Sequence, residues 1–237
     1  MEDALELIYS RRSIRRYTDE PVPEELILRI LEAGRWSPTA GDLNPWRMIV
    51  IRGENKDKLE AMMKKQAVYM GARLAKSSFG TKVEDNVDPE KQERARAALA
   101  NLYKTGGFMT MGFRAPVIIV MLGHLGGAVW EDVPACIENM LLEAHSLGLG
   151  CCWYPVELGE RSGYEWKKIL GVPGVADYAV VAWFSIGWPA QSPKARPRKP
   201  LEEVVYWESF GNTRKLPEIP LTGKYEVKVQ KKQEEGK

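Results

Sequence analysis

Cysteine and histidine are scarce in this chain of 237 residues, which contains three Cys and two His. Because the cysteines are few and odd in number (Cys136, Cys151 and Cys152), they form no disulfide framework, and we expect small buried thiols in a reducing, cytoplasmic setting. No spacing joins His124 or His145 to the cysteines, so we expect no catalytic metal held by the protein. A Ser-His-Asp arrangement for nucleophilic catalysis is lacking as well.

Long apolar runs and a large net charge are also lacking. The longest candidate for a membrane span, residues 115–122, is much shorter than the roughly 18 apolar residues that a membrane helix needs. The acidic start of the chain is not followed by the apolar segment of a signal peptide. A formal net charge of +2 is too small to predict binding to nucleic acid or to membranes. The basic residues are grouped locally, so we expect any bound anion to be small.

What the chain does contain is an alternation of helical and strand-like apolar patterns. Strands are expected at residues 47–51, 116–122, 149–156 and 178–186. Helices are expected at residues 2–10, 23–34, 56–65, 133–147 and 164–170. The pattern indicates a mixed α/β layer architecture in a single domain. Gly148 is expected to cap the end of the fourth helix, and since Gly148 and Gly150 follow a helix instead of opening one, a Rossmann dinucleotide fold is not supported.

Residues 66–113 interrupt this alternation. Within them Asp88, Pro89 and Glu90 are typical of a helix start, and the apolar residues that follow keep the helical period. A mostly helical excursion between two core strands fits either a lid over a site or a plain surface insertion.

A group of arginines near the start is the first candidate site. Arg11, Arg12, Arg15 and Arg16 lie within six positions and enclose Ser13. Whether this stretch is helical or extended, two or three guanidinium groups and a hydroxyl converge on a small volume. Guanidinium groups match phosphate oxygens bidentately, although an isolated cluster is more typical of a solvated basic turn.

A second basic pair, Arg196 and Arg198, lies in a proline-rich segment far along the chain. The prolines are expected to hold this segment extended, so that side chains two residues apart project to the same side. Two such groups of arginines favour a phosphate pocket over two solvated patches.

Four motifs occur in order along the chain. They are Arg-Arg-Ser-Ile-Arg at 11–15, Ser-Pro-Thr-Ala-Gly-Asp-Leu-Asn-Pro-Trp at 37–46, Leu-Gly-Leu-Gly-Cys-Cys-Trp at 147–153, and Gly-Trp-Pro at 187–189 leading to Arg-Lys-Pro-Leu-Glu-Glu-Val at 198–204. Together they resemble the FMN-dependent nitroreductase superfamily. The resemblance implies an α+β nitroreductase-like fold, with a central, mainly antiparallel sheet flanked by helices, in an intertwined homodimer. Residues 1–205 would be the FMN-binding domain, with 66–113 as its variable helical cap, and residues 206–237 a C-terminal arm and charged tail.

The same resemblance assigns residues to the cofactor FMN, which would lie at the subunit interface. Its phosphate, ribityl chain and pyrimidine edge would be held by Arg11, Arg12, Ser13 and Arg15, with Arg196 and Arg198 completing the phosphate clamp. Main chain at Pro155 and Val156 would approach the N5 edge, where only the Val156 amide can donate because proline has no N–H. The partner subunit would bring to the same flavin a loop that contains Pro38, Thr39, Ala40, Gly41 and Asn44.

The implied activity is that of an oxidoreductase. Hydride would pass from NAD(P)H through flavin N5 to a nitroaromatic, a quinone or another small organic acceptor, and donors near N1 would stabilise the reduced flavin. Two alternatives stay open: a non-enzymatic protein that binds flavin or nucleotide phosphate, and a family variant such as a reductive dehalogenase or an enzyme that fragments flavin.

Some positions depart from the family pattern. Asp42 and Asn44 stand where many relatives have Asn and Gln, and a carboxylate there would disfavour neighbouring negative charge, so Asp42 is a candidate for contact with substrate. Other candidates to cover the flavin or touch substrate lie in the excursion: Tyr69, Arg73, Lys76, Tyr103 and Lys104. Beyond the last motif we expect residues 207–221 to pack on the partner subunit, 225–229 to form an edge strand, and 231–237 to be a frayed tail.

Overall fold

The computed structural model describes residues 4–76, 90, 93–94, 96–97, 101, 110–156, 160–173 and 177–216. Side chains are described throughout these ranges except at 67–76 and 160–162, which lie within two helices.

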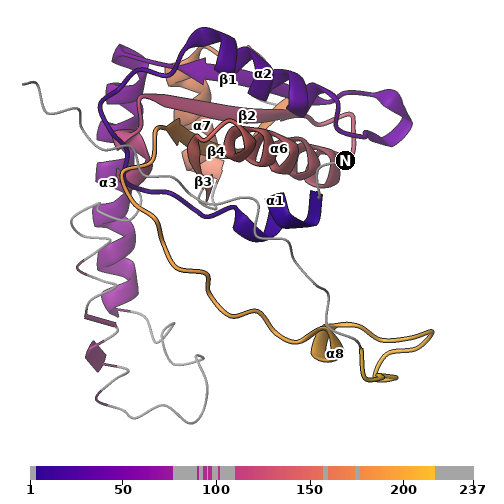
Figure 1. Cartoon of the computed structure of the whole chain (residues 1–237). Coiled ribbons are helices and arrows are strands. Elements are labelled where there is room, and N and C mark those ends of the chain that lie inside the picture. Colours follow the sequence, from indigo (N-terminus) through magenta and orange to yellow (C-terminus); the bar gives the residue numbers. More distant parts are fainter. Residues whose placement is uncertain are drawn as a thin grey trace, which may run out of the picture.

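A four-stranded antiparallel sheet lies at the centre of the molecule (Figure 1). Its strands follow the order β1-β2-β4-β3, and every neighbouring pair is antiparallel. The strands are β1 (Trp46–Ile51), β2 (Val117–His124), β3 (Gly150–Pro155) and β4 (Tyr178–Gly187). All four lie within one or two residues of the expected strands, and helices flank the sheet, so the expected α+β class is confirmed.

Strand β2 is buried on both faces, which explains why its sequence reads as a continuous apolar run. Val117, Ile119 and Met121 point to one face, and Ile118 and Val120 to the other; each is at most 1% exposed. Alternation along a strand thus divides the interior into two separate cores.

The first core is covered by helices α2 (Glu24–Arg35) and α6 (Val129–Ser146). α2 begins directly after Pro23 and carries Glu24 and Glu25 in its first turn, where acidic side chains favour the helix dipole. The two helices pack closely at Gly34, where a Cβ atom would lie only 2.6 Å from Cγ of Met140. Glycine there lets the helices approach each other.

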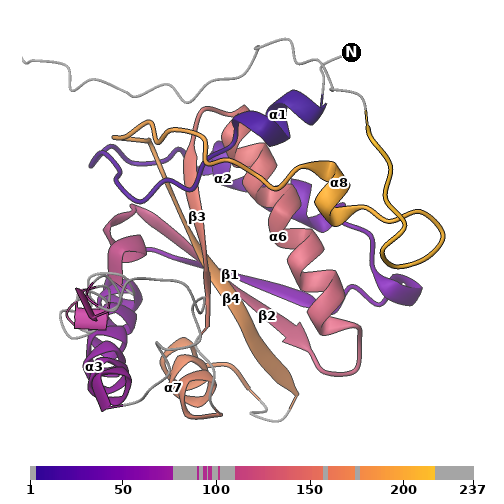
Figure 2. The same cartoon turned by 90° about the horizontal axis from the view of Figure 1, so that it is seen from below.

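The second core lies on the opposite face, under α3 (Glu54–Lys76) and α7 (Glu160–Leu170), as Figure 2 shows. It is rich in aromatic side chains: Tyr154 stacks on Trp183 with ring centroids 4.2 Å apart, and Trp166 lies 6.1 Å from the same ring. The sheet is therefore sandwiched between two helical layers.

The shorter elements lie around this sandwich. Helix α1 (Ala4–Ser10) lies near α6, and the 3-10 turns η1 (Ala40–Asp42) and η3 (Met111–Arg114) precede β1 and β2. After β4 the chain leaves the body as a long segment that carries the four-residue helix α8 (Leu201–Val204) away from the sheet (Figure 1). No helix in the described parts of the chain is long and apolar enough to span a membrane.

Three expected helix boundaries were wrong. The helix expected at residues 164–170 begins four residues earlier, at Glu160. The helix expected at residues 56–65 continues to Lys76, so part of the supposed excursion belongs to α3. The helix expected from residue 133 begins at Val129 with Pro134 inside it, because Glu131 and Asp132, not the proline, occupy its first turn. The helix expected after Pro89 lies mostly outside the described residues, as do residues 217–237.

The close contact between β3 and the arginine stretch gives a test of packing. A Cβ atom at Gly150 would lie 2.8 Å from Cβ of the buried, β-branched Ile14. We expect Gly150→Ala to lower the free energy of unfolding by about 1–3 kcal/mol, since overpacking must displace Ile14 or the strand. Gly163→Ala in α7 is the matched control, because its would-be Cβ has no described atom within 4 Å beyond the adjoining residues and the backbone of its own helix. Equal urea midpoints for the two variants would contradict this packing.

Candidate functional site

The arginine stretch is extended and is fastened to the edge of the sheet. Ser13 forms a parallel bridge with Cys151 of β3, and the amide of Ile14 donates a 2.8 Å hydrogen bond to the Cys151 carbonyl. Further along, the amide of Thr18 donates to the Trp188 carbonyl at 3.0 Å. The structure thus decides between the two conformations that the sequence left open.

The side chain of Tyr17 links the same stretch to strand β4. Its hydroxyl donates to the Ile14 carbonyl and lies 2.6 Å from the hydroxyl of Ser185, a fully buried residue of β4. Burial raises the pKa of Tyr17 well above its usual value, so the phenol stays protonated and remains a donor.

Among the described residues, the guanidinium groups have few anionic partners. Nε of Arg11 lies 3.8 Å from the Glu138 carboxylate, a loose pair. Nη1 of Arg12 donates to the carbonyls of Tyr9 and Arg11, at 2.5 and 2.9 Å, and Nη1 of Arg15 donates to the Ser13 carbonyl at 3.5 Å. Nε of Arg15 is buried and has no hydrogen-bond partner among the described residues. Arg12 and Arg15 therefore leave positive charge that an anion can neutralise.

Pro155 and Val156 continue from the strand that holds the arginines. Cys151, which pairs with Ser13, and Pro155 lie four residues apart on β3, a distance of about 13 Å along an extended strand. The arginine stretch and the main chain at Val156 are thus placed along one sheet edge.

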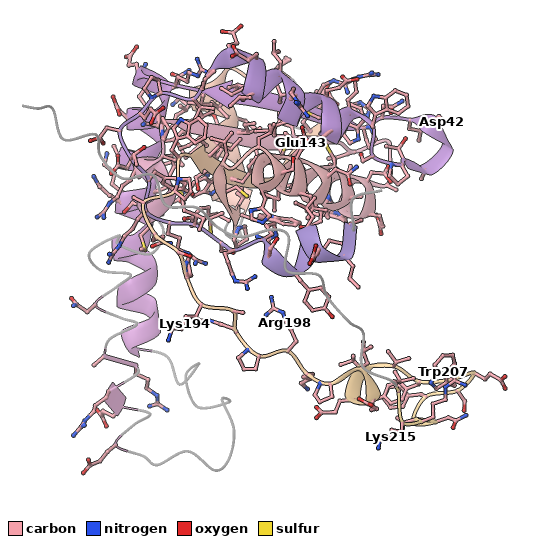
Figure 3. All side chains as sticks on the ribbon, viewed as in Figure 1. Asp42, Glu143, Lys194, Arg198, Trp207 and Lys215 are labelled. Atoms are coloured by element: carbon pink, nitrogen blue, oxygen red, sulfur yellow. The ribbon has the colours of Figure 1, made fainter. Side chains whose placement is uncertain are left out.

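The loop before β1 has a fixed left-handed conformation. Gly41, Asp42 and Asn44 have φ angles of 59°, 54° and 46°. The amide side chain of Asn44 donates to the Asp42 carbonyl at 2.7 Å, and its backbone amide donates to Oγ1 of Thr39 at 3.4 Å. Pro38 and Ala40 are exposed with Gly41, Asp42 and Asn44, and Asp42 lies at one extremity of the molecule (Figure 3).

Asp132 holds this loop, and sequence reasoning did not identify it. Both of its carboxylate oxygens accept from the Ala40 amide, at 3.2 and 3.3 Å, and the residue is only 6% exposed. Its sequence signal, an acid in the first turn of a helix, is common to many helices without such a contact.

The loop and the arginine stretch lie apart within one protomer. Asp132 holds the loop near the start of α6, whereas His145, near its end, contacts Ser10 just before the arginines. Thirteen residues separate these contacts, about 20 Å along a helix. The structure therefore brings together residues 11–15 and β3, but not residues 38–44.

The remaining candidates lie farther out or are undescribed. Arg196 and Arg198 are exposed on the segment that leaves the body, and the guanidinium of Arg198 is directed back toward the body (Figure 3). Tyr69 and Arg73 belong to α3, but their side chains, like all of Tyr103, are outside the described part of the chain.

The three thiols are buried, as expected. Burial raises the pKa of Cys136 and of Cys151 to about 12 and also raises that of Cys152, so none is a thiolate near neutral pH. Nucleophilic catalysis by cysteine is therefore not supported by this site.

Known proteins resemble this chain over most of its length. The chain is 30% identical over 217 residues to the NADH dehydrogenase of Thermus thermophilus, covering 86% of this chain and 96% of the relative. A Desulfovibrio desulfuricans protein solved in complex with FMN is 27% identical, with a TM-score of 0.58 over 89% of this chain and 99% of that one. A BluB-like flavoprotein of Clostridium difficile 630 shares the fold at 20% identity, with a TM-score of 0.67 over 88% of this chain and all of the other.

A family model described as the nitroreductase family matches residues 8–188, from the end of α1 to the end of β4. The match includes the arginine stretch, the loop before β1 and the whole sheet. The chain belongs to the nitroreductase family.

Proposed function

We propose that this protein is an FMN-dependent oxidoreductase that transfers hydride from NAD(P)H to a nitroaromatic, a quinone or another small organic acceptor. The observation that carries the proposal is the arginine stretch, whose positive charges have few anionic partners among the described residues. This stretch is hydrogen-bonded to β3, the strand that ends at Pro155. Family membership supports it, as does the FMN in the Desulfovibrio desulfuricans structure.

The residues fit a phosphate at one end of the site. Arg11 and Arg12 would hold its oxygens, and Arg15, whose Nε is buried without a partner, would face the pyrimidine edge. Ser13 would contact the ribityl chain from between them. Arg196 and Arg198 would complete the phosphate clamp. The prolines on either side of them favour an extended backbone, in which two side chains two residues apart project to the same side.

The residues at the far end of β3 fit the reactive edge. When bound, FMN would accept hydride at N5 and deliver two electrons to the acceptor. The Val156 amide would orient the N5 edge, and the Arg15 cation would stabilise negative charge near N1. Hydride transfer needs close, oriented partners but no nucleophile, which agrees with the buried, protonated thiols.

A homodimer would complete each site. Since Pro38, Thr39, Ala40, Gly41 and Asn44 lie far from the arginines of their own chain, we propose that they reach the flavin of a second copy. The segment after β4 supports this assembly, because its apolar residues lie exposed in the protomer: Leu201 44%, Val204 53% and Phe210 90%. Such exposure is typical of a surface that a partner covers.

Asp42 would contact the acceptor, with Tyr69, Arg73 and Tyr103 as further candidates from the cap. Its backbone is held by Asn44, so the position of the carboxylate is limited by the loop. We place the enzyme in the cytoplasm, since three cysteines that form no disulfide framework suit a reducing compartment.

The first test of this function is colour. Purified protein is expected to be yellow and to bleach anaerobically when NADH or NADPH is added, as followed by absorbance near the flavin maximum. Yellow protein that neither nucleotide bleaches would indicate binding without turnover. Colourless protein that does not take up added FMN would overturn the proposal.

Removing two guanidinium groups tests the phosphate end. Arg11→Ala combined with Arg15→Ala should weaken FMN binding by about 100-fold or more, because each charge-assisted contact contributes roughly 1.5–3 kcal/mol. The exposed Arg16 is the matched control, and Arg16→Ala should stay within about 3-fold of the parent, the size of one exposed charge effect. Full flavin occupancy in the folded double variant would show that the cluster is a solvated turn and not a phosphate site.

The segment after β4 offers a test of assembly. Phe210→Asp should shift the protein toward monomer in sedimentation velocity, because a carboxylate would be buried at the interface. Phe210→Leu, which keeps the apolar surface, should sediment like the parent. A stable dimer in the aspartate variant would remove this segment from the interface.

A further inference from the structure

His145 is a buried polar side chain that joins the end of α6 to the end of α1. It is 8% exposed, and its Nε2 lies 2.8 Å from Oγ of Ser10. The Ser10 hydroxyl also donates to the Leu7 carbonyl at 3.1 Å. A hydroxyl has one proton to donate and two lone pairs, so the arrangement is complete when Nε2–H of His145 donates to Ser10.

This contact fixes the point where the chain leaves α1. The helix has only seven residues, too few to be stable alone, so its end depends on tertiary contacts. Four residues after Ser10, the amide of Ile14 is bound to the Cys151 carbonyl. Arg11, Arg12 and Ser13 are thus held between two fixed points, and the first of them is the contact with His145.

The charges around His145 suit such a role. Burial, and then the charges of Arg11 and Arg12, lower the pKa of His145 to about 4, so the ring is neutral near pH 7. A neutral donor fastens the chain without repelling the neighbouring guanidinium groups. Glu138 precedes His145 by about two turns on the same side of α6, and its carboxylate lies 3.8 Å from Nε of Arg11.

We propose that His145 is a positioning residue of the phosphate subsite, acting through Ser10 to aim Arg11 and Arg12 at the phosphate of FMN. The proposal rests on the proposed function, because it concerns the cofactor site of that reaction. The proposal predicts that His145 affects the part of the binding affinity that comes from the phosphate. The part that comes from the flavin ring system should be unchanged.

Riboflavin, which lacks the phosphate, tests this separation. His145→Phe should weaken FMN binding by about 5- to 10-fold, the effect of one hydrogen bond, and leave riboflavin affinity within about 2-fold. His145→Gln, whose amide can still donate to Ser10, should restore FMN affinity. Ser10→Ala removes the acceptor with little effect on packing, and should reproduce the selective loss. The double variant Ser10→Ala with His145→Phe should lose no more than either one alone.

Asp132→Asn is the matched control on the same helix, since Asp132 is equally buried but holds the loop of residues 38–44. It should leave the ratio of FMN to riboflavin affinity at the parent value. The affinities are measured by quenching of flavin fluorescence on titration of flavin-free protein at pH 7.

The outcomes separate the two proposals. If the parent binds FMN more tightly than riboflavin, but His145→Phe and Ser10→Ala lower both affinities alike or neither, the inference is wrong and the proposed function stands. If the parent binds the two flavins equally, no phosphate subsite exists and the inference is again wrong. If it binds neither, the proposed function fails as well.

Discussion

The attachment of residues 11–17 to the edge of β3 is the interaction on which the candidate site depends. One backbone hydrogen bond, from the Ile14 amide to the Cys151 carbonyl, aligns the stretch with the strand. The Ile14 side chain fills the space that the absent side chain of Gly150 leaves, and is 1% exposed. Alternation then places the neighbouring Ser13 and Arg15 on the side of the stretch opposite Ile14, so burial of one apolar residue orients the polar residues beside it.

Helix α6 gives this attachment a rigid support. Its apolar side chains fill the first core beneath the sheet, and its polar ones reach outward at both ends. Asp132 holds the Ala40 loop, Glu138 lies near Arg11, and His145 binds Ser10. One buried helix therefore sets the position of two segments that lie about 20 Å apart. In the proposed dimer these two segments would contact different flavins. Because α6 is rigid, it would hold the two segments at a fixed distance from each other.

The elements with strong periodicity were predictable. The β2 run is apolar at every position because both faces are buried, and α6 shows the helical period because one face packs on the sheet. The length of α3 was not predictable in the same way, since the apolar residues within 66–76 are interspersed with small and basic ones and give no clear end. The start of α6 was misplaced because Pro134 suits a first turn, whereas here it lies within the helix, one residue after a well-packed Val133.

The sequence by itself determined the family, the class of fold and the chemistry of the candidate residues, because the order and spacing of motifs can be read without knowing the tertiary structure. Arg11, Arg12 and Arg15 could be singled out as candidate ligands of an anion from their type, and Pro155 as a position without a donor from its covalent structure. Only the tertiary structure decided that the stretch is extended, and that Asp132 and His145 hold the two segments. An acid in a first turn and a histidine in a last turn are ordinary in a sequence. Their roles arise from contacts across 92 and 135 residues of chain, which no local pattern records.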